Sequence, residues 1–141
     1  MKRSHFNRYR TQWTAQFYAA AELTRRGYLV SLTFGNAPRF DLIVVSPNGT
    51  PFTVDVKGQS TKNFWLIQPR DKNSDHFFVL IFLPKMPECP RYFILSSDKL
   101  MDLREAYREK TMLKRRYSDE LGGINWSTAF EYENKWENLP R

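Results

Sequence analysis

The 141-residue sequence predicts a single α/β (α+β) domain, residues 1–141, in which an N-terminal helix precedes a central mixed β-sheet of about five strands flanked by helices. Three observations lead to this prediction. Apolar residues at helical spacing come first, short apolar segments separated by turn residues follow, and helical spacing returns near the C-terminus. Hydrophobic residues make up 41% of the chain, which is enough for one buried core and argues against a disordered chain.

The first element is expected to be a helix over residues 12–26, preceded by a mobile basic arm at residues 1–10. Thr11 is placed to cap the helix and Gly27 to end it. The apolar stripe that should face the sheet consists of Trp13, Phe17, Ala20, Ala21 and Leu23.

The strands are expected at residues 28–34, 40–46, 51–57, 64–68, 77–83 and 91–95. An Asn48-Gly49 pair between the second and third strands is a hairpin-turn signal. Ser97 and Asp98 can cap a following helix. A final helix is expected to place Ala129, Tyr132, Trp136 and Leu139 on one face.

Composition narrows the class of protein. No apolar run approaches the roughly 20 residues that span a bilayer, and no apolar signal core follows the basic N-terminus, so a cytoplasmic protein is expected. Cys89 is the single cysteine, which leaves no disulfide framework or thiolate zinc cluster. The net charge of +7 is concentrated in residues 1–26 and 104–116, and clustered positive charge favours a polyanionic partner such as nucleic acid.

The residues that indicate chemistry lie on the second and third strands. Asp41 opens one apolar strand, and Asp55 and Lys57 end the next, where strand alternation places them on one face. Magnesium or manganese prefers oxygen ligands, which Asp41, Asp55 and the backbone carbonyl of Val56 can provide, while Lys57 can orient a water and neutralise charge. The alternative is an exposed Asp55–Lys57 charge pair, which contributes about 0–1 kcal/mol to stability.

The order of helix, strand, Asp strand, Asn-Gly turn and Asp-x-Lys strand resembles the PD-(D/E)xK nuclease superfamily, which includes restriction endonucleases and small Holliday-junction resolvases. The resemblance covers about residues 12–68 and implies a restriction-endonuclease-like fold, with its core motif in residues 11–68 and the remaining strands and helices in 69–141. It also implies divalent-metal-dependent hydrolysis of DNA phosphodiester bonds. Position 40 is Phe where the family has Pro, and Gln16 stands where the family has a helical Glu. On a helical wheel Gln16 lies roughly 60° from the centre of the apolar stripe and Glu22 roughly 180° from it, so Gln16 is the residue expected at the site.

The hairpin register poses a condition for this site. A two-residue turn at Asn48-Gly49 would set Asp41 opposite Val56 and so place the two aspartates on opposite faces of the sheet. A shared cation therefore requires a bulge, an odd-length loop, or Asp41 at the twisted mouth of its strand.

Three functions remain open from the sequence. The first is a metal-dependent DNA endonuclease, for which a homodimer would suit the cutting of two strands. The second, motivated by Gln16, is a catalytically impaired nuclease fold that binds nucleic acid or protein, and the third is an oligomeric structural subunit. Further residues expected to contact nucleic acid, with turn or solvated surface as their alternative, are Gln59, Ser60, Lys110, Lys114, Arg115 and Arg116.

Overall fold

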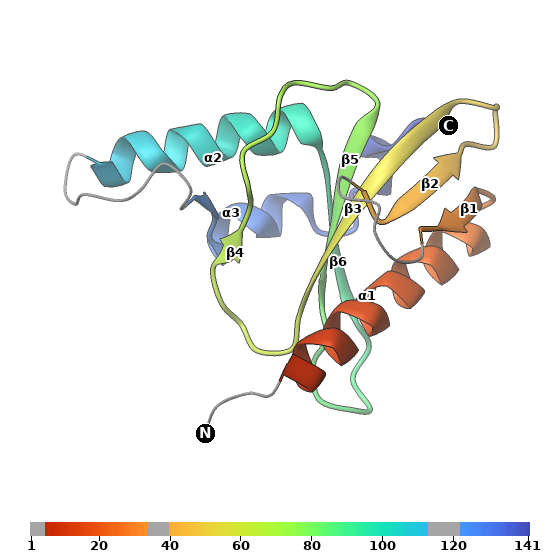
Figure 1. The fold of residues 1–141 in the computed structure, drawn as a ribbon, viewed down its shortest axis with the longest axis horizontal. Coiled ribbons are helices and arrows are strands. Elements are labelled where there is room, and N and C mark those ends of the chain that lie inside the picture. Colours follow the sequence, from red (N-terminus) through yellow and green to blue (C-terminus); the bar gives the residue numbers. More distant parts are fainter. Residues whose placement is uncertain (1–4, 34–39, 113–121) are drawn as a thin grey trace.

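A five-stranded mixed sheet forms the centre of this computed structural model, which describes residues 5–33, 40–112 and 122–141 (Figure 1). The strands of this sheet, in spatial order, are β1 (Leu29–Leu32), β2 (Leu42–Val45), β3 (Pro51–Gln59), β5 (His76–Phe82) and β6 (Arg91–Ser96). β3 and β5 are parallel, and the other neighbours are antiparallel. The predicted α/β class with its mixed central sheet is confirmed.

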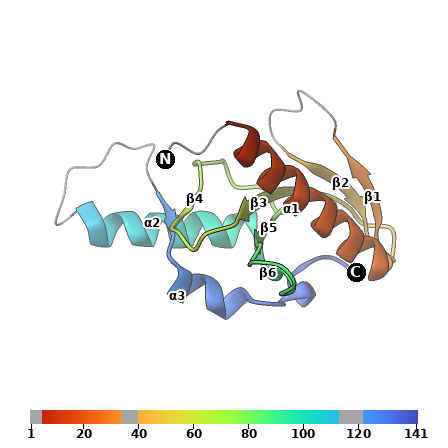
Figure 2. The same cartoon turned by 90° about the horizontal axis from the view of Figure 1, so that it is seen from below.

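Helices cover both faces of the sheet. α1 (His5–Arg25) lies on one face, whereas α2 (Ser97–Met112) and the short α3 (Trp126–Ala129) pack on the other. Figure 2 shows α1 and α3 on opposite sides of the strands. A two-stranded sheet of β4 (Trp65–Leu66) and β7 (Gly123–Ile124) lies beside α2, so the predicted strand at 64–68 forms but does not join the main sheet.

The buried face of α1 differs from the predicted stripe. Ala15, Ala19 and Leu23 are fully buried against the sheet, whereas Phe17 is 53% exposed. The physical reason is the close approach of the helix to Gly58 of β3, where a Cβ would lie 2.7 Å from the Cβ of Ala15. At that separation small side chains fit and aromatic ones do not.

The ends of α1 also correct one expectation and confirm another. The helix begins at His5, so residues 5–10 are helical rather than a mobile arm, and Thr11 lies inside the helix, where its hydroxyl donates to the carbonyl of Asn7 at 3.0 Å. Gly27 ends the helix with a φ of 94°. The amide of Tyr28 donates to the carbonyl of Leu23 at 3.1 Å, which is the six-to-one bond of a Schellman motif.

The C-terminal segment is not the continuous helix that was predicted. After α3, two 3₁₀ turns follow at η1 (Phe130–Tyr132) and η2 (Trp136–Asn138), and Asn134 between them has a φ of 57°, which interrupts helical backbone. Trp136 and Leu139 are nevertheless buried, in the core that α1 covers.

This segment returns to the beginning of the sheet. The hydroxyl of Tyr28 donates to the carbonyl of Pro140 at 2.7 Å, and the guanidinium of Arg26 lies 4.4 Å from the ring centroid of Trp136. None of the helices that the structure describes is long and apolar enough to cross a membrane.

Candidate active site

Asp41, immediately before β2, lies opposite Asp55 of the neighbouring strand β3. The register pairs Leu42 with Val54, and the preceding Asp41 therefore falls opposite Asp55 on the same face of the sheet. The condition that the hairpin register sets for a shared site is met.

An odd-length loop produces this register. Val45 pairs with Pro51, so five residues connect the strands in place of a two-residue Asn-Gly turn. Ser46 closes the loop, because its amide donates to the carbonyl of Thr50 at 2.8 Å and its hydroxyl accepts from the amide of Thr50 at 2.9 Å. Gly49 supports the reversal with a φ of 90°.

The carboxylate of Asp41 is held at both oxygens. Oδ2 accepts from the backbone amide of Val56 at 2.7 Å, and Oδ1 accepts from Nε2 of Gln16 at 3.3 Å. Burial, together with the neighbouring carboxyl of Asp55 and against the effect of the Val56 amide, raises the pKa of Asp41 to about 6. Two facing carboxylates of this kind repel each other unless a proton or a cation lies between them.

Asp55 carries two cationic neighbours. Its Oδ1 lies 3.4 Å from Nζ of Lys57, and its Oδ2 lies 3.5 Å from Nη1 of Arg70. The Asp55 side chain is only 16% exposed, so the pair is more than the exposed surface pair that the sequence left as an alternative. Asp41, Asp55, Lys57 and Gln16 are thus brought together as the sequence predicts.

Gln12 is a site residue that the sequence analysis missed. Its Nε2 donates to the carbonyl of Val56 at 2.7 Å, and its Oε1 accepts from the amide of Gly58 at 3.3 Å. No described strand pairs with this edge of β3 beyond Val54, so the side chains of Asp41 and Gln12 bind the backbone groups there. The signal in the sequence is the spacing of Gln12 and Gln16, four residues apart and hence on one helical face.

The hydrogen bond from Gln12 involves one of the groups that the sequence predicts as a metal ligand. The carbonyl of Val56, predicted as a metal ligand, already accepts a hydrogen bond from Gln12. A carbonyl oxygen has two lone pairs, so this bond leaves one of them for a cation beside the two carboxylates.

This donor set fits magnesium or manganese. Mg²⁺ commonly binds through one or two carboxylates and completes its octahedron with water and substrate phosphates. Within residues 5–33, 40–112 and 122–141 no group of three or more His, Cys, Asp or Glu side chains could hold a metal. A cation here would have Asp41 and Asp55 as its carboxylate ligands and would relieve their mutual repulsion.

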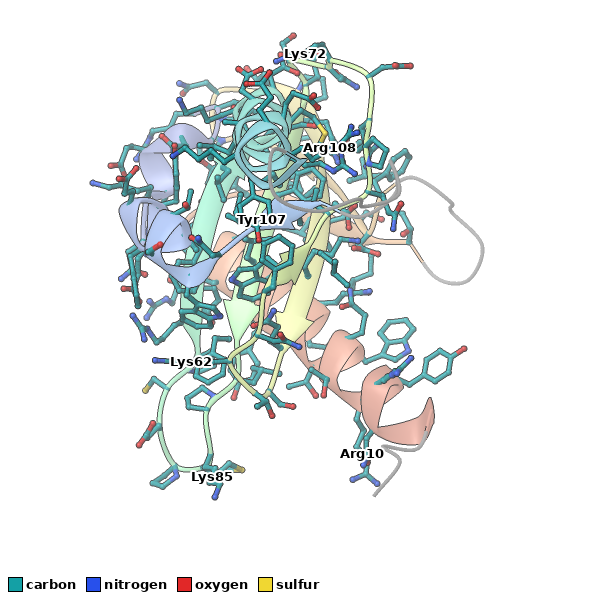
Figure 3. All side chains as sticks on the ribbon, turned by 90° about the vertical axis from the view of Figure 1, so that its left-hand side faces the viewer. Arg10, Lys62, Lys72, Lys85, Tyr107 and Arg108 are labelled. Carbon is teal, nitrogen blue, oxygen red and sulfur yellow. The ribbon has the colours of Figure 1, made fainter. Side chains whose placement is uncertain are left out.

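An open cavity of about 930 Å³ lies in front of Asp55 and Lys57. Its other wall is the segment from Gln68 to Ser74, which includes Arg70 and Lys72. α2 holds this wall in place, since Lys72 pairs with Asp102 and the amide of Asn73 donates to Asp98 Oδ1 at 2.7 Å. Figure 3 shows Lys72 beside the start of α2.

The other predicted nucleic-acid residues have different surroundings. The side-chain amide of Gln59 forms hydrogen bonds within the turn that follows β3, where its Nε2 donates to the carbonyls of Asn63 and Phe64 at 2.9 and 3.1 Å. Ser60 is exposed beside it, and Lys110 is exposed on α2. Lys114, Arg115 and Arg116 lie outside the described residues.

His76 is buried near the site, as a structural residue rather than an exposed one. Its Nδ1 lies 2.6 Å from the hydroxyl of Thr53, and its Nε2 has no hydrogen-bond partner among the described residues. Burial, together with the positive charge of Arg70, lowers the pKa of His76 to about 4.

The helix, mixed sheet and flanking helices together form a restriction-endonuclease-like fold. No family model and no curated protein matches the sequence. Among solved structures, the chain is similar to the bacterial homing endonuclease I-Ssp6803I, with a TM-score of 0.54 and 15% sequence identity over 90% of this chain and 88% of that chain. Similarity at this level of identity shows a shared fold.

Proposed function

We propose that the protein is a divalent-metal-dependent endonuclease that hydrolyses DNA phosphodiester bonds. The observation that carries the proposal is the facing pair of Asp41 and Asp55, with Lys57 in contact with Asp55 at the edge of an open cavity. The fold supports it, because a structure described as a homing endonuclease shares that fold.

Each residue of the site has a separate role. Asp41 and Asp55 hold Mg²⁺ or Mn²⁺, which supplies Lewis-acid polarisation of the phosphate when bound. Lys57 orients the attacking water and offsets the charge that develops on the phosphate, and Arg70 adds a second positive charge on the cavity wall. Gln16 positions Asp41 through its 3.3 Å hydrogen bond.

The test is cleavage of plasmid DNA by the purified protein with and without magnesium. We expect Asp55→Asn and Lys57→Met each to lower the cleavage rate by at least about 100-fold, since each removes a group aimed at the reacting phosphate. Asp71→Asn and Lys72→Met are matched controls, because these residues line the same cavity without contacting Asp55 and should change the rate by only a few fold. Equal rates for all four variants would refute the assignment of the catalytic residues.

A second candidate function follows from the two glutamines. Gln16 brings no negative charge, and Gln12 shares the Val56 carbonyl with any cation, so the site attracts a cation less strongly than three carboxylates would. A nuclease fold that binds nucleic acid without cutting it fits this arrangement. Gln16→Glu distinguishes the two functions: a nuclease that already cleaves gains little, whereas an impaired site gains tighter magnesium binding by calorimetry together with new cleavage.

The oligomeric state is a separate part of the proposal. A homodimer would present two sites and could cut both strands of a duplex. Sedimentation velocity of the protein alone and with duplex DNA measures this directly, and a monomer in both conditions would refute the dimer.

A further inference from the structure

A second groove of about 630 Å³ lies between the first turns of α1 and the end of β3. The residues that line it are Asn7, Arg8, Arg10, Thr11, Gln12, Gly58, Gln59, Ser60, Thr61 and Asn63. None of these described lining residues carries a carboxylate, whereas the first cavity contains two aspartates. The groove therefore combines two arginines with hydroxyl and amide groups and carries a net positive charge.

Gln12 and β3 connect this groove to the candidate active site. The side chain of Gln12 lines the groove and bonds Val56 and Gly58, while the neighbouring Lys57 lines the first cavity. From Lys57 to Ser60 the chain advances three residues, which is at most about 10 Å. Each nucleotide of a duplex strand rises about 3.4 Å along the helix axis, but its phosphates wind around that axis and lie farther apart than this rise, so the same distance reaches only the first or second phosphate from the cleaved bond.

The walls of the groove are fixed before any ligand binds. Gly58 allows α1 to pack directly on β3, since an added Cβ would lie 2.7 Å from Ala15 and 3.1 Å from the carbonyl of Thr11. The turn on the opposite wall is braced by Gln59, whose Oε1 accepts from the amide of Asn63 at 3.3 Å and from Nε1 of Trp126 at 3.3 Å. Preformed walls reduce the entropy that is lost on binding.

The charge on this side of the molecule extends beyond the groove. Figure 3 labels Arg10 on the first turns of α1 and Lys62 in the turn after β3. Nζ of Lys62 lies 5.1 Å from the ring centroid of Trp126, which places its charge near the turn that forms the groove wall. Guanidinium groups with hydroxyl and amide donors and no acid are the chemistry that recognises phosphate.

We propose that this groove binds backbone phosphates of the same nucleic-acid strand whose cleaved bond lies at Asp55 and Lys57, one or two phosphates away along that strand. Its position relative to the cleaved bond rests on the proposed function, whereas phosphate binding by the groove does not. The strand would pass from the first cavity over the end of β3 into the groove, with Arg8 and Arg10 on phosphate oxygens.

The test is duplex binding by fluorescence anisotropy in EDTA, over a series of salt concentrations, for the double variant Arg8→Gln/Arg10→Gln. The matched control is Lys99→Gln/Lys135→Gln, which removes the same charge from exposed positions outside both grooves. We expect the arginine variant to bind at least 10-fold more weakly and to lose about 1.8 from the slope of log K against log salt, since each phosphate contact contributes about 0.9. Arg8→Lys/Arg10→Lys should restore most of the slope because it restores the charge.

Equal affinity and slope for the arginine variant and the lysine control would refute the proposal that the groove binds phosphate. An unchanged circular dichroism spectrum and Tm show that the arginine variant is folded; if it unfolds, each single variant and its expected slope change of about 0.9 replace it. Because this assay contains no metal and measures no cleavage, an inactive protein that still shows the slope change refutes the proposed function alone.

A second arm locates the phosphate along the strand. A neutral methylphosphonate is placed at each position around the cleaved bond, and its effect on binding is compared between the wild type and the arginine variant. We expect the effect to disappear in the variant at the first or second phosphate from the cleaved bond. The same effect in both proteins at every position would refute the proposed path.

Discussion

His76 should make the stability of this protein depend on pH. Its side chain is 1% exposed, and burial, together with Arg70, lowers its pKa from 6.5 to about 4. The unfolded chain therefore takes up a proton below pH 6.5, whereas the folded protein does so only near pH 4. The contribution of His76 to stability is complete above pH 6.5 and is lost as the pH falls toward 4.

The size of the effect follows from the shift. One pKa unit corresponds to about 1.4 kcal/mol, so the shift of His76 limits its contribution to the free energy of unfolding to about 3 kcal/mol. About 2 kcal/mol of this contribution is lost between about pH 7.5 and about pH 5. Urea unfolding of the wild type and His76→Gln at both pH values measures it. The destabilisation caused by His76→Gln should be about 2 kcal/mol smaller at about pH 5 than at about pH 7.5.

The control for this experiment is His5→Gln, which changes the other of the two histidines. Asp41, whose raised pKa of about 6 gives the opposite pH dependence, is present in every protein compared, so its contribution cancels from each difference. If the cost of His76→Gln is the same at both pH values, or if His5→Gln shows the same pH dependence, the account of His76 is wrong.

Three further predictions concern packing and metal binding. Gly58→Ala should lower the free energy of unfolding by about 1–3 kcal/mol, because the new Cβ would lie 2.7 Å from that of Ala15; adding Ala15→Gly should recover part of the loss, and an equal loss in the double variant would contradict this packing. Gly123→Ala should cost about 3 kcal/mol or more, since its Cβ would fall 1.7 Å from the carbonyl oxygen of Trp65, and a near-neutral result in urea unfolding would count against the β4–β7 pairing. Magnesium at about 100 times its Kd should raise the free energy of unfolding of the wild type by about 2.7 kcal/mol and leave Asp41→Asn unchanged; an equal rise in both proteins would exclude Asp41 as a ligand.

The fold could be predicted because its signals are local. Each strand of the main sheet carries its own apolar pattern and is bounded by turn residues, so its position does not depend on distant contacts. The prediction of a continuous final helix was wrong because the signal that interrupts it is not part of the apolar pattern. Its apolar spacing is real, and Trp136 and Leu139 are buried, but the backbone reverses at Asn134, which the spacing of apolar residues does not record.

The site could be predicted only in part. The residues Asp41, Asp55 and Lys57 were identifiable, but whether the two carboxylates meet depended on the length of one loop. That length is set by the hydrogen bonds between Ser46 and Thr50, which the Asn-Gly pattern does not reveal.

The orientation of α1 shows a further limit of the sequence. Its aromatic side chains are the most hydrophobic, so the helical wheel selected their face for burial, yet the face that packs on the sheet is built from alanines, Leu23 and Gln16. The residue that decides this is Gly58, which is distant in sequence and on another element. Gln12 lies on the same packed face, and its role depends on an unpaired edge of β3 that is visible only in the folded sheet.

The return of the C-terminal segment to Tyr28 has a consequence for the order of folding during synthesis. Gln16, Asp41, Asp55 and Lys57 of the candidate active site all precede position 58. The core beneath α1 is nevertheless closed by Trp136 and Leu139, and the bond from Tyr28 to Pro140 joins residues 112 positions apart. Contacts of such long sequence separation form late and slow folding. A ribosome-bound chain that ends before this segment would expose the apolar surface that Trp136 and Leu139 cover, so the sheet and α1 should become protected from proteases only after this segment emerges.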